Sequence, residues 1–191
     1  MFQIEQLIII GAPSCAGKSY LIEKIQRGDY PHLCAQLGIF NQSSWHFLTA
    51  ADLNHMRQPI IGRVVVHYDL YFQYSQDNGF GYLEELMYKS DKLVVLTIKV
   101  EKKLLIKRTN LKVLRAIFGL VVRKKVARVT RLKRIRRMLK MKKLYKRGFS
   151  EFLYERWFNY LLHSNIATHW LINPNDSDVI IAYPYMEDKV F

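Results

Sequence analysis

The chain has 191 residues, half of them hydrophobic and 13% aromatic, which is enough to form one domain with its own core. Its two cysteines, Cys15 and Cys34, are too few for a disulfide framework, and its first residues lack the features of a signal peptide. No segment approaches the ~18 consecutive apolar residues that cross a bilayer. We therefore expect a single cytoplasmic domain, residues 1–191, with no transmembrane segment.

The net charge of +14 is distributed very unevenly along the chain. Between Lys102 and Ser150 there are 20 Lys and Arg and no Asp or Glu, so the rest of the chain, with 10 basic and 16 acidic residues, has a net charge of −6. A strongly basic segment is attracted to anionic partners such as nucleic acid or a membrane surface. The charge alone does not distinguish between these partners.

Short apolar runs predict strands, and periodic apolar residues predict helices between them. The first run, at residues 6–10, is followed by a glycine-bearing loop and by an amphipathic helix at 19–27 that ends at Gly28. Further strands are predicted at 37–40, 64–69, 93–98 and 168–172, and further helices at 82–88, from about 101, at 122–144 and from Ser150. This alternation predicts an α/β fold of three layers, with a roughly five-stranded parallel sheet covered by helices on both faces.

Apolar residues recur every three or four positions in the predicted helix at 122–144, and Lys and Arg fill its other faces. The apolar stripe consists of Val122, Val126, Val129, Leu132, Ile135 and Leu139. We therefore expect a basic helical segment at about residues 117–149, resembling a lid on the domain.

The most specific motif lies between the first predicted strand and the first predicted helix. It reads Ala12, Pro13, Ser14, Cys15, Ala16, Gly17, Lys18 and Ser19. This is the phosphate-binding loop pattern with alanine in place of the first glycine. Such a loop needs inward-facing backbone N–H groups, a lysine that reaches the terminal phosphates and a hydroxyl for Mg²⁺, and all three are present. The simpler alternative is a lysine-containing helix start, but the strand before the loop and the helix after it favour phosphate binding.

Asp69 follows the apolar run Val64 to Val66 and is predicted at the carboxyl end of a buried strand. A carboxylate there could hold Mg²⁺ through water or accept a proton from an acceptor hydroxyl, and the alternative role is a strand-end cap. His67, two residues earlier, is more simply a packed neutral histidine.

Arginines in the second half of the chain are candidates for offsetting phosphate charge. Arg108, in the helix that follows the strand at 93–98, could stabilise a phosphoryl group during transfer. The candidates in and after the basic segment are Arg123, Arg128, Arg131, Arg134 and Arg156. Each of these has a simpler alternative as a solvated residue on an exposed helix face.

These features together resemble the P-loop kinases of the nucleoside-monophosphate-kinase-like group, which includes small-molecule kinases. The similarity covers residues 7–108 as an ordered pattern of loop, strand-end aspartate, strand and arginine-bearing helix. It implies a five-stranded parallel sheet, MgATP as donor, Lys18 and Ser19 as phosphate and Mg²⁺ residues, and Asp69 as the metal-positioning or acid/base carboxylate. It also implies that the basic segment is an arginine-rich lid that closes over the phosphates.

The preferred function is transfer of the terminal phosphoryl group of MgATP, or MgGTP, to a hydroxyl of a small-molecule or saccharide-type acceptor. The alternative is a nucleotide-dependent ATPase or binding module whose basic helix binds nucleic acid, a glycolipid or an anionic membrane surface. In that case the protein would be peripheral to a membrane. Sulfuryl transfer is less favoured, because it does not need the metal that Ser19 and Asp69 are suited to hold.

Overall fold

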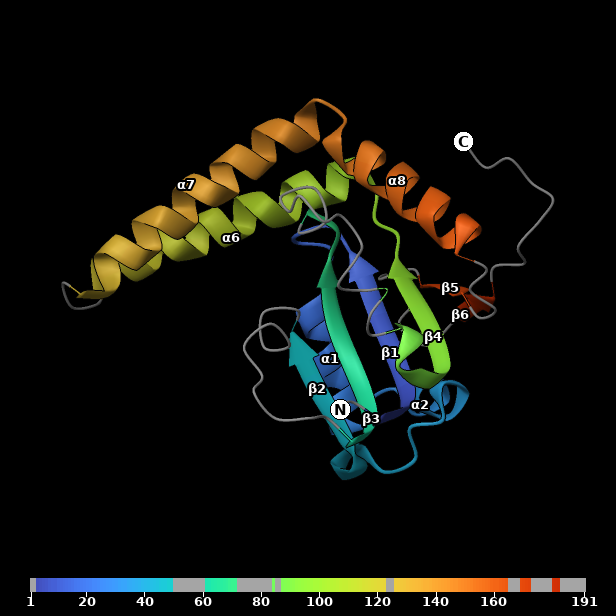
Figure 1. Cartoon of the computed structure of the whole chain (residues 1–191). Coiled ribbons are helices and arrows are strands. Elements are labelled where there is room, and N and C mark those ends of the chain that lie inside the picture. The colour runs from blue at the N-terminus through green and yellow to red at the C-terminus, as the bar shows by residue number, and fades with distance from the viewer. Residues whose placement is uncertain are drawn as a thin grey trace.

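The structure is a computed structural model and describes residues 3–49, 61–71, 84, 87–122, 126–164, 169–172 and 180–182. The strands are β1 (Gln3–Ala12), β2 (Trp45–Thr49), β3 (Ile61–Asp69), β4 (Ser90–Ile98), β5 (His169–Ile172) and β6 (Ile180–Ala182). The helices are α1 (Lys18–Arg27), α2 (Pro31–Leu37), the short 3₁₀ helix η1 (Gln42–Ser44), α6 (Lys102–Val122), α7 (Val126–Lys146) and α8 (Phe149–His163). The chain is therefore an α/β protein (Figure 1).

The strands form one sheet in the order β2-β3-β1-β4-β5-β6. Every neighbouring pair is parallel except β5 with β6, which is antiparallel. The sheet therefore differs from the predicted purely parallel one, because the described residues add an antiparallel strand at one edge. The chain visits β3 on one side of β1 and then β4 on the other, so the strand order reverses around β1.

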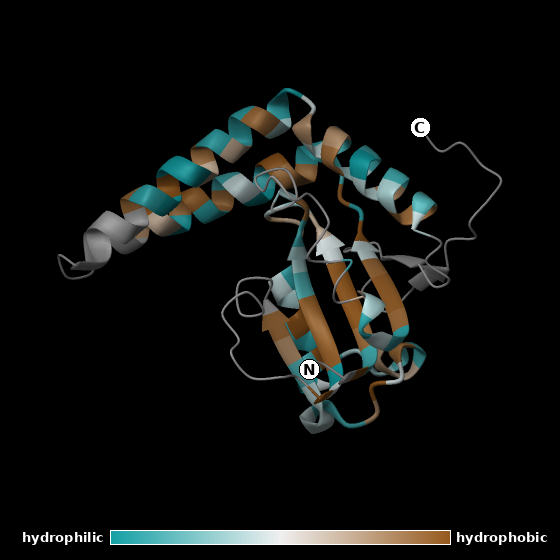
Figure 2. Cartoon of the chain, in the orientation of Figure 1, coloured by the Kyte–Doolittle hydropathy of each residue, from teal (hydrophilic) through white to brown (hydrophobic). Residues whose placement is uncertain are grey.

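Alternate residues of β1 face two different apolar layers, because side chains alternate across a strand. Ile8 and Ile10 pack in a core with residues of α1 and α2, whereas Leu7 and Ile9 pack in a second core with residues of α8. The middle parts of β1, β3 and β4 are accordingly brown in Figure 2, and helices pack on both faces of the sheet. Every one of these β1 side chains is fully buried, which explains why the run is continuously apolar.

Helix α8 is held against the end of β1 by Trp157. A Cβ on Gly11 would lie 2.9 Å from Cζ2 of Trp157, so only glycine allows this close approach. The indole N–H of Trp157 donates to Oγ1 of Thr97 at 2.8 Å, which satisfies a polar group in a fully buried ring. This packing positions the strand immediately before the phosphate-loop motif.

The strand predicted at residues 37–40 is wrong. Leu37 is the last residue of α2, and Gly38 ends that helix in the left-handed conformation with φ of 72°. The apolar residues Leu33, Cys34 and Leu37 form the buried side of a short helix, and Ile39 packs with them. The next strand after β1 in the chain, β2, begins later, at Trp45, and pairs with β3.

Helices α6 and α7 pack against one another as a hairpin that projects from the carboxyl ends of the strands (Figure 1). The predicted apolar stripe is only partly correct, since Ile135 is buried but Leu132 and Leu139 are exposed. The buried side of α7 instead continues through Met138, Met141 and Tyr145. The predicted helix at 82–88 lies largely outside the described residues. No described helix is both long enough and apolar enough to span a bilayer.

Candidate functional site

The segment between β1 and α1 turns back tightly on itself. The N–H of Ala16 donates to the carbonyl of Pro13 at 3.2 Å, and Cys15 and Gly17 adopt positive φ values of 71° and 115°. Position 17 favours glycine, because its backbone is left-handed and Nη1 of Arg108 lies 3.4 Å from where a Cβ would be. Helix α1 begins directly afterwards, and its first-turn N–H groups have no partner within the helix. Such a helix start favours an anion.

Lys18 folds back over this loop instead of extending into solvent. Its side chain is only 3% exposed, and Nζ donates to the carbonyls of Ala12 and Pro13 at 2.6 and 2.8 Å. Nζ also lies 3.5 Å from Oδ2 of Asp69. Burial lowers the pKa of Lys18, and the nearby Asp69 carboxylate opposes that effect. All three of these contacts are with oxygen atoms, two from the loop and one from the end of β3.

Asp69, the last residue of β3, accepts hydrogen bonds on both carboxylate oxygens, one from the loop and one from the chain that follows β3. Oδ2 accepts a hydrogen bond from Oγ of Ser14 at 2.6 Å, and Oδ1 accepts one from the N–H of Tyr71 at 3.0 Å. Burial raises the pKa of Asp69, but the Lys18 charge and these two hydrogen bonds outweigh it and hold the pKa below its ordinary value. Asp69 is therefore an ionised carboxylate beside the loop, where the sequence predicts it.

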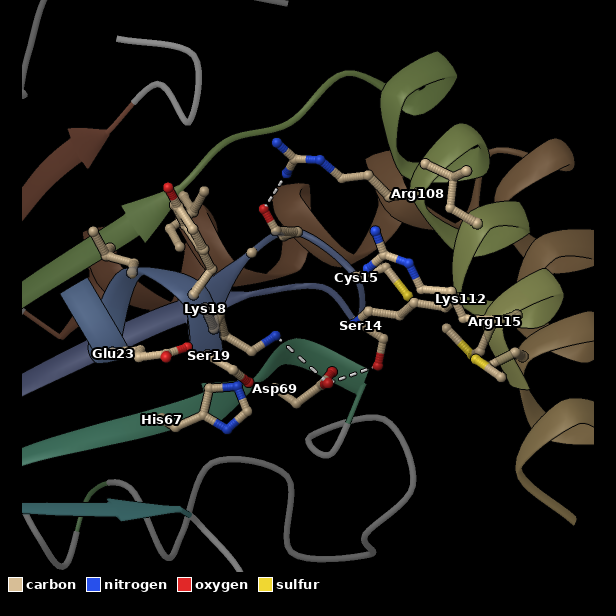
Figure 3. Close-up of a pocket in the computed structure, with 18 of the residues that line it drawn as sticks. Ser14, Cys15, Lys18, Ser19, Glu23, His67, Asp69, Arg108, Lys112 and Arg115 are labelled. Carbon is tan, nitrogen blue, oxygen red and sulfur yellow. Dashed lines mark hydrogen bonds and ion pairs between the residues drawn. The ribbon is translucent and has the colours of Figure 1, made fainter. Parts of the chain in front are cut away.

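His67 lies two residues before Asp69 on β3 and faces the same region (Figure 3). Burial lowers its pKa to about 4, and the charges of Lys18 and Lys112 act in the same direction. The imidazole is therefore neutral at neutral pH, as the sequence predicts. The positive charge around the pocket therefore comes from lysine and arginine side chains and not from His67.

A pocket of about 730 Å³ opens between the loop, the end of β3 and the hairpin (Figure 3). Among the sequence-predicted residues, the structure brings Lys18, Ser19, Asp69, Arg108 and Arg134 together in its lining, with Ser14 to Gly17 of the motif. Ala12 and Pro13 contribute the carbonyls that hold Lys18. The lining also contains three cations that the sequence reasoning missed, Lys112, Arg115 and Arg137.

Helical spacing was the signal that could have found two of the missed cations. Lys112 and Arg115 follow Arg108 by four and seven residues, so they share one side of α6. Arg156 lies on α8 and does not line the pocket. Arg123 lies outside the described residues, as do the side chains of Arg128 and Arg131.

Both helices of the hairpin are fastened to the loop backbone. From α6, Nη1 of Arg108 donates to the carbonyl of Ala16. From α7, the fully buried Tyr145 donates its hydroxyl to the carbonyl of Ser14 at 2.8 Å. Burial raises the pKa of Tyr145, so its hydroxyl keeps the proton that it donates. The loop is therefore held from three directions, by Asp69, α6 and α7.

The oxygen groups around the loop fit a magnesium ion. Ser19, in the first turn of α1, and Asp69 both line the pocket, and Mg²⁺ prefers a hydroxyl, a carboxylate, water and phosphate oxygens. Mg²⁺ usually keeps several waters and binds one or two protein oxygens together with substrate phosphates. Ser19 and Asp69 could therefore hold the ion. Water molecules and phosphate oxygens would supply its remaining ligands.

Comparisons with models of known protein families, with curated proteins and with solved structures found no match to this chain. The position of the pocket in the sheet is informative by itself. It lies at the carboxyl end of β1, where the strand order reverses between β3 and β4. In open α/β sheets, ligands bind outside the carboxyl ends of the strands at such a reversal.

Proposed function

We propose that this protein binds MgATP, or MgGTP, and transfers the terminal phosphoryl group to a hydroxyl of a small-molecule or saccharide-type acceptor. The observation that carries the proposal is the Lys18 ammonium, buried at the loop mouth against two loop carbonyls and beside Asp69. Those carbonyl contacts are the kind that phosphate oxygens replace, since a charge-assisted bond to phosphate is stronger.

The proposed fold is a three-layer P-loop fold of the nucleoside-monophosphate-kinase-like group, with the α6–α7 hairpin as its lid. Two features support this assignment. The loop leads from the central strand β1 into the N-terminus of α1, and Asp69 ends the adjacent parallel strand β3. The hairpin lines the pocket with Arg and Lys side chains from α6 and with Arg side chains from α7.

In the proposed mechanism, the N–H groups of the loop and of the first turn of α1 hold the phosphates, and Lys18 moves from the loop carbonyls to a phosphate oxygen. Ser19 and Asp69 would hold Mg²⁺, which would offset charge on the phosphates. Arg108, Arg134 and the neighbouring cations stabilise the charge that spreads over the phosphoryl oxygens during transfer.

Asp69 has the geometry for the proton step as well. Its carboxylate is ionised, because Lys18 and Ser14 lower its pKa, and it opens on the same pocket. An acceptor hydroxyl in this pocket would give its proton to Asp69 as its oxygen attacks the terminal phosphorus, and the bond from that phosphorus to the bridging oxygen would break to release ADP or GDP. The volume of about 730 Å³ is within the range of small-molecule sites.

The reaction is tested by measuring ADP formation with and without a panel of hydroxyl acceptors: nucleosides, sugars and shikimate-like acids. We expect turnover that depends on one acceptor class and that falls about 10²- to 10⁴-fold in Asp69→Asn. Asp29→Asn is the matched control, because Asp29 pairs with Lys24 outside the pocket and should leave the rate unchanged. Rapid hydrolysis without any acceptor, or an unchanged rate in Asp69→Asn, would contradict phosphoryl transfer.

A further inference from the structure

The hairpin has an apolar surface that faces solvent instead of the pocket. On α6, Phe118 is 71% exposed, and Leu114 and Ile117 are 50% and 44% exposed. On α7, Leu132 and Leu139 are 48% and 42% exposed. We call these five residues the outer flank. Large apolar side chains gathered on one exposed surface are typical of an interaction site.

Helical spacing separates the outer flank from the cationic pocket. Each residue of an α-helix turns by about 100°, so Leu114 and Ile117 lie at least about 100° around α6 from the three pocket cations of that helix. Phe118 lies only about 60° from Arg115 and forms the border of the outer flank. Leu132 and Leu139 lie about 140–160° from Arg134 and Arg137 on α7. Substitutions at Leu114 and Leu132 therefore leave the pocket lining in place.

The packing between the two helices places both halves of the outer flank on the same side. Val113 of α6 packs against Ile135 and Met138 of α7, which defines the seam of the hairpin. The pocket cations lie to one side of this seam on both helices. Leu114 and Ile117 of α6 and Leu132 and Leu139 of α7 lie to the other side, because they are rotated the opposite way from the seam. Phe118 lies at the outer border of these residues. They therefore form one continuous surface.

Cations border this apolar surface on both helices. Lys103 and Lys107 precede Leu114 by eleven and seven residues, and Arg136 and Lys143 follow Leu132 by four and eleven, so helical spacing brings all four to the outer flank. All four are exposed. No Asp or Glu occurs between Lys102 and Ser150 to neutralise them. The surface thus combines aliphatic and aromatic side chains with unopposed positive charge.

We propose that the outer flank of the α6–α7 hairpin binds an anionic lipid surface. A helix surface with Lys and Arg beside Leu, Ile and Phe buries its apolar side chains at the boundary of headgroups and acyl chains, while the cations contact lipid phosphates. A second copy of the chain would bring two positive flanks together, which like charges oppose. Nucleic acid would satisfy the cations but leave four aliphatic side chains in water, and only Phe118 could stack on a base.

The experiment is sedimentation of the purified full chain with vesicles of phosphatidylcholine alone and of phosphatidylcholine with about 30% phosphatidylserine, without nucleotide. We expect at least about tenfold more binding to the anionic vesicles. The variant Leu114→Gln/Leu132→Gln keeps every charge and suits a helix, and it should reduce that binding at least about tenfold. The matched control is Phe40→Gln/Tyr88→Gln, which removes two side chains that are 81% and 92% exposed elsewhere, and it should bind as wild type.

Three results would overturn the lipid proposal. One is equal binding to neutral and anionic vesicles, or an equal loss in the control variant. Another is binding of a single-stranded RNA in place of vesicles, with an affinity that Leu114→Gln/Leu132→Gln leaves unchanged. The third is a dimer in sedimentation equilibrium that the same variant dissociates. If the double variant loses its helical circular dichroism, the charge variant Lys103→Gln/Lys107→Gln replaces it and must weaken anionic-vesicle binding. Because nucleotide is absent throughout, these outcomes are independent of the proposed phosphoryl transfer.

Discussion

The Lys18 ammonium is almost completely removed from water, and a buried charge is stable only when it is paired and hydrogen-bonded. The structure provides this through the carbonyls of Ala12 and Pro13 and through Asp69. The arrangement keeps the lysine in place before any phosphate arrives. Its partners are main-chain carbonyls and one shared carboxylate, so an arriving phosphate can replace them without leaving Asp69 unpaired, since Ser14 still donates to it.

His67 makes stability depend on pH in a way that can be measured. Its folded pKa is about 4 and its ordinary value is 6.5, so between these values the unfolded chain binds a proton that the folded chain does not. Stability therefore decreases as pH falls from about 6.5 to about 4. Because His67 is partly exposed, we expect a loss on the order of 1–2 kcal/mol from this group.

Urea unfolding of wild type and His67→Gln at about pH 7 and about pH 4.5 measures this loss. The wild type should lose more stability than the variant over that interval, because glutamine does not titrate. Asp69 acts in a separate window, since its lowered pKa removes stability only as pH falls below its ordinary value of 3.8. Equal losses in the two proteins would show that His67 is not held neutral by its surroundings.

At the residue scale, the sequence predicted the loop and Asp69, but not how they are joined. The spacing of Gly17, Lys18 and Ser19 is a local pattern, and the apolar run before Asp69 places it at a strand end. The bond from Ser14 to Asp69 connects residues 55 positions apart and depends on β3 pairing with β1. No local signal records that pairing.

At the scale of elements, the hairpin and the loop form one connected unit. Arg108 of α6 and Tyr145 of α7 donate to successive parts of the loop backbone, at Ala16 and Ser14. A displacement of either helix therefore moves the loop carbonyls that it holds. This gives the proposed lid a direct connection to the backbone that we propose binds phosphate.

Removing the Tyr145 hydroxyl tests that connection. Tyr145→Phe leaves the partly buried carbonyl of Ser14 without this donor, so we expect a loss of about 1–2 kcal/mol in stability and weaker MgATP binding. The matched control is Tyr154→Phe. Its hydroxyl is also buried and donates to the carbonyl of Ile98 at the end of β4, so this bond does not hold the loop backbone. Both variants should lose stability in urea, but only Tyr145→Phe should raise the Kd for MgATP; equal Kd values in the two would disprove the coupling.

The helical part of the chain shows why sequence patterns fail where tertiary packing decides. The stripe through Leu132 and Leu139 has correct helical spacing, yet the structure buries Met138 and Tyr145 instead. Packing against α6 and against the loop determines which side of α7 is buried. The sequence of α7 alone does not contain the position of these neighbours. The strand predicted at residues 37–40 was wrong for a similar reason. A short segment with three apolar residues fits the end of a helix as well as a strand.

At the scale of the whole molecule, charge is divided between two regions. The hairpin segment from Lys102 to Ser150 has 20 basic and no acidic residues, whereas the remainder has a net charge of −6. One side of the hairpin directs its cations into the pocket, and the other side places them around exposed apolar residues. This division accounts for the two proposed anionic ligands, a nucleoside triphosphate in the pocket and a lipid surface at the outer flank.

The most direct test of the nucleotide site is calorimetric titration of MgATP into wild type, Lys18→Ala and Lys24→Ala. Lys24 lies on the same helix but pairs with Asp29 outside the pocket, so its removal controls for the loss of a positive charge. We predict that wild type and Lys24→Ala bind alike and that Lys18→Ala, with its circular dichroism unchanged, binds about 10- to 100-fold more weakly. Absence of binding by the wild type, or equal affinity in all three proteins, would contradict the assignment of residues 12–19 as a phosphate-binding loop.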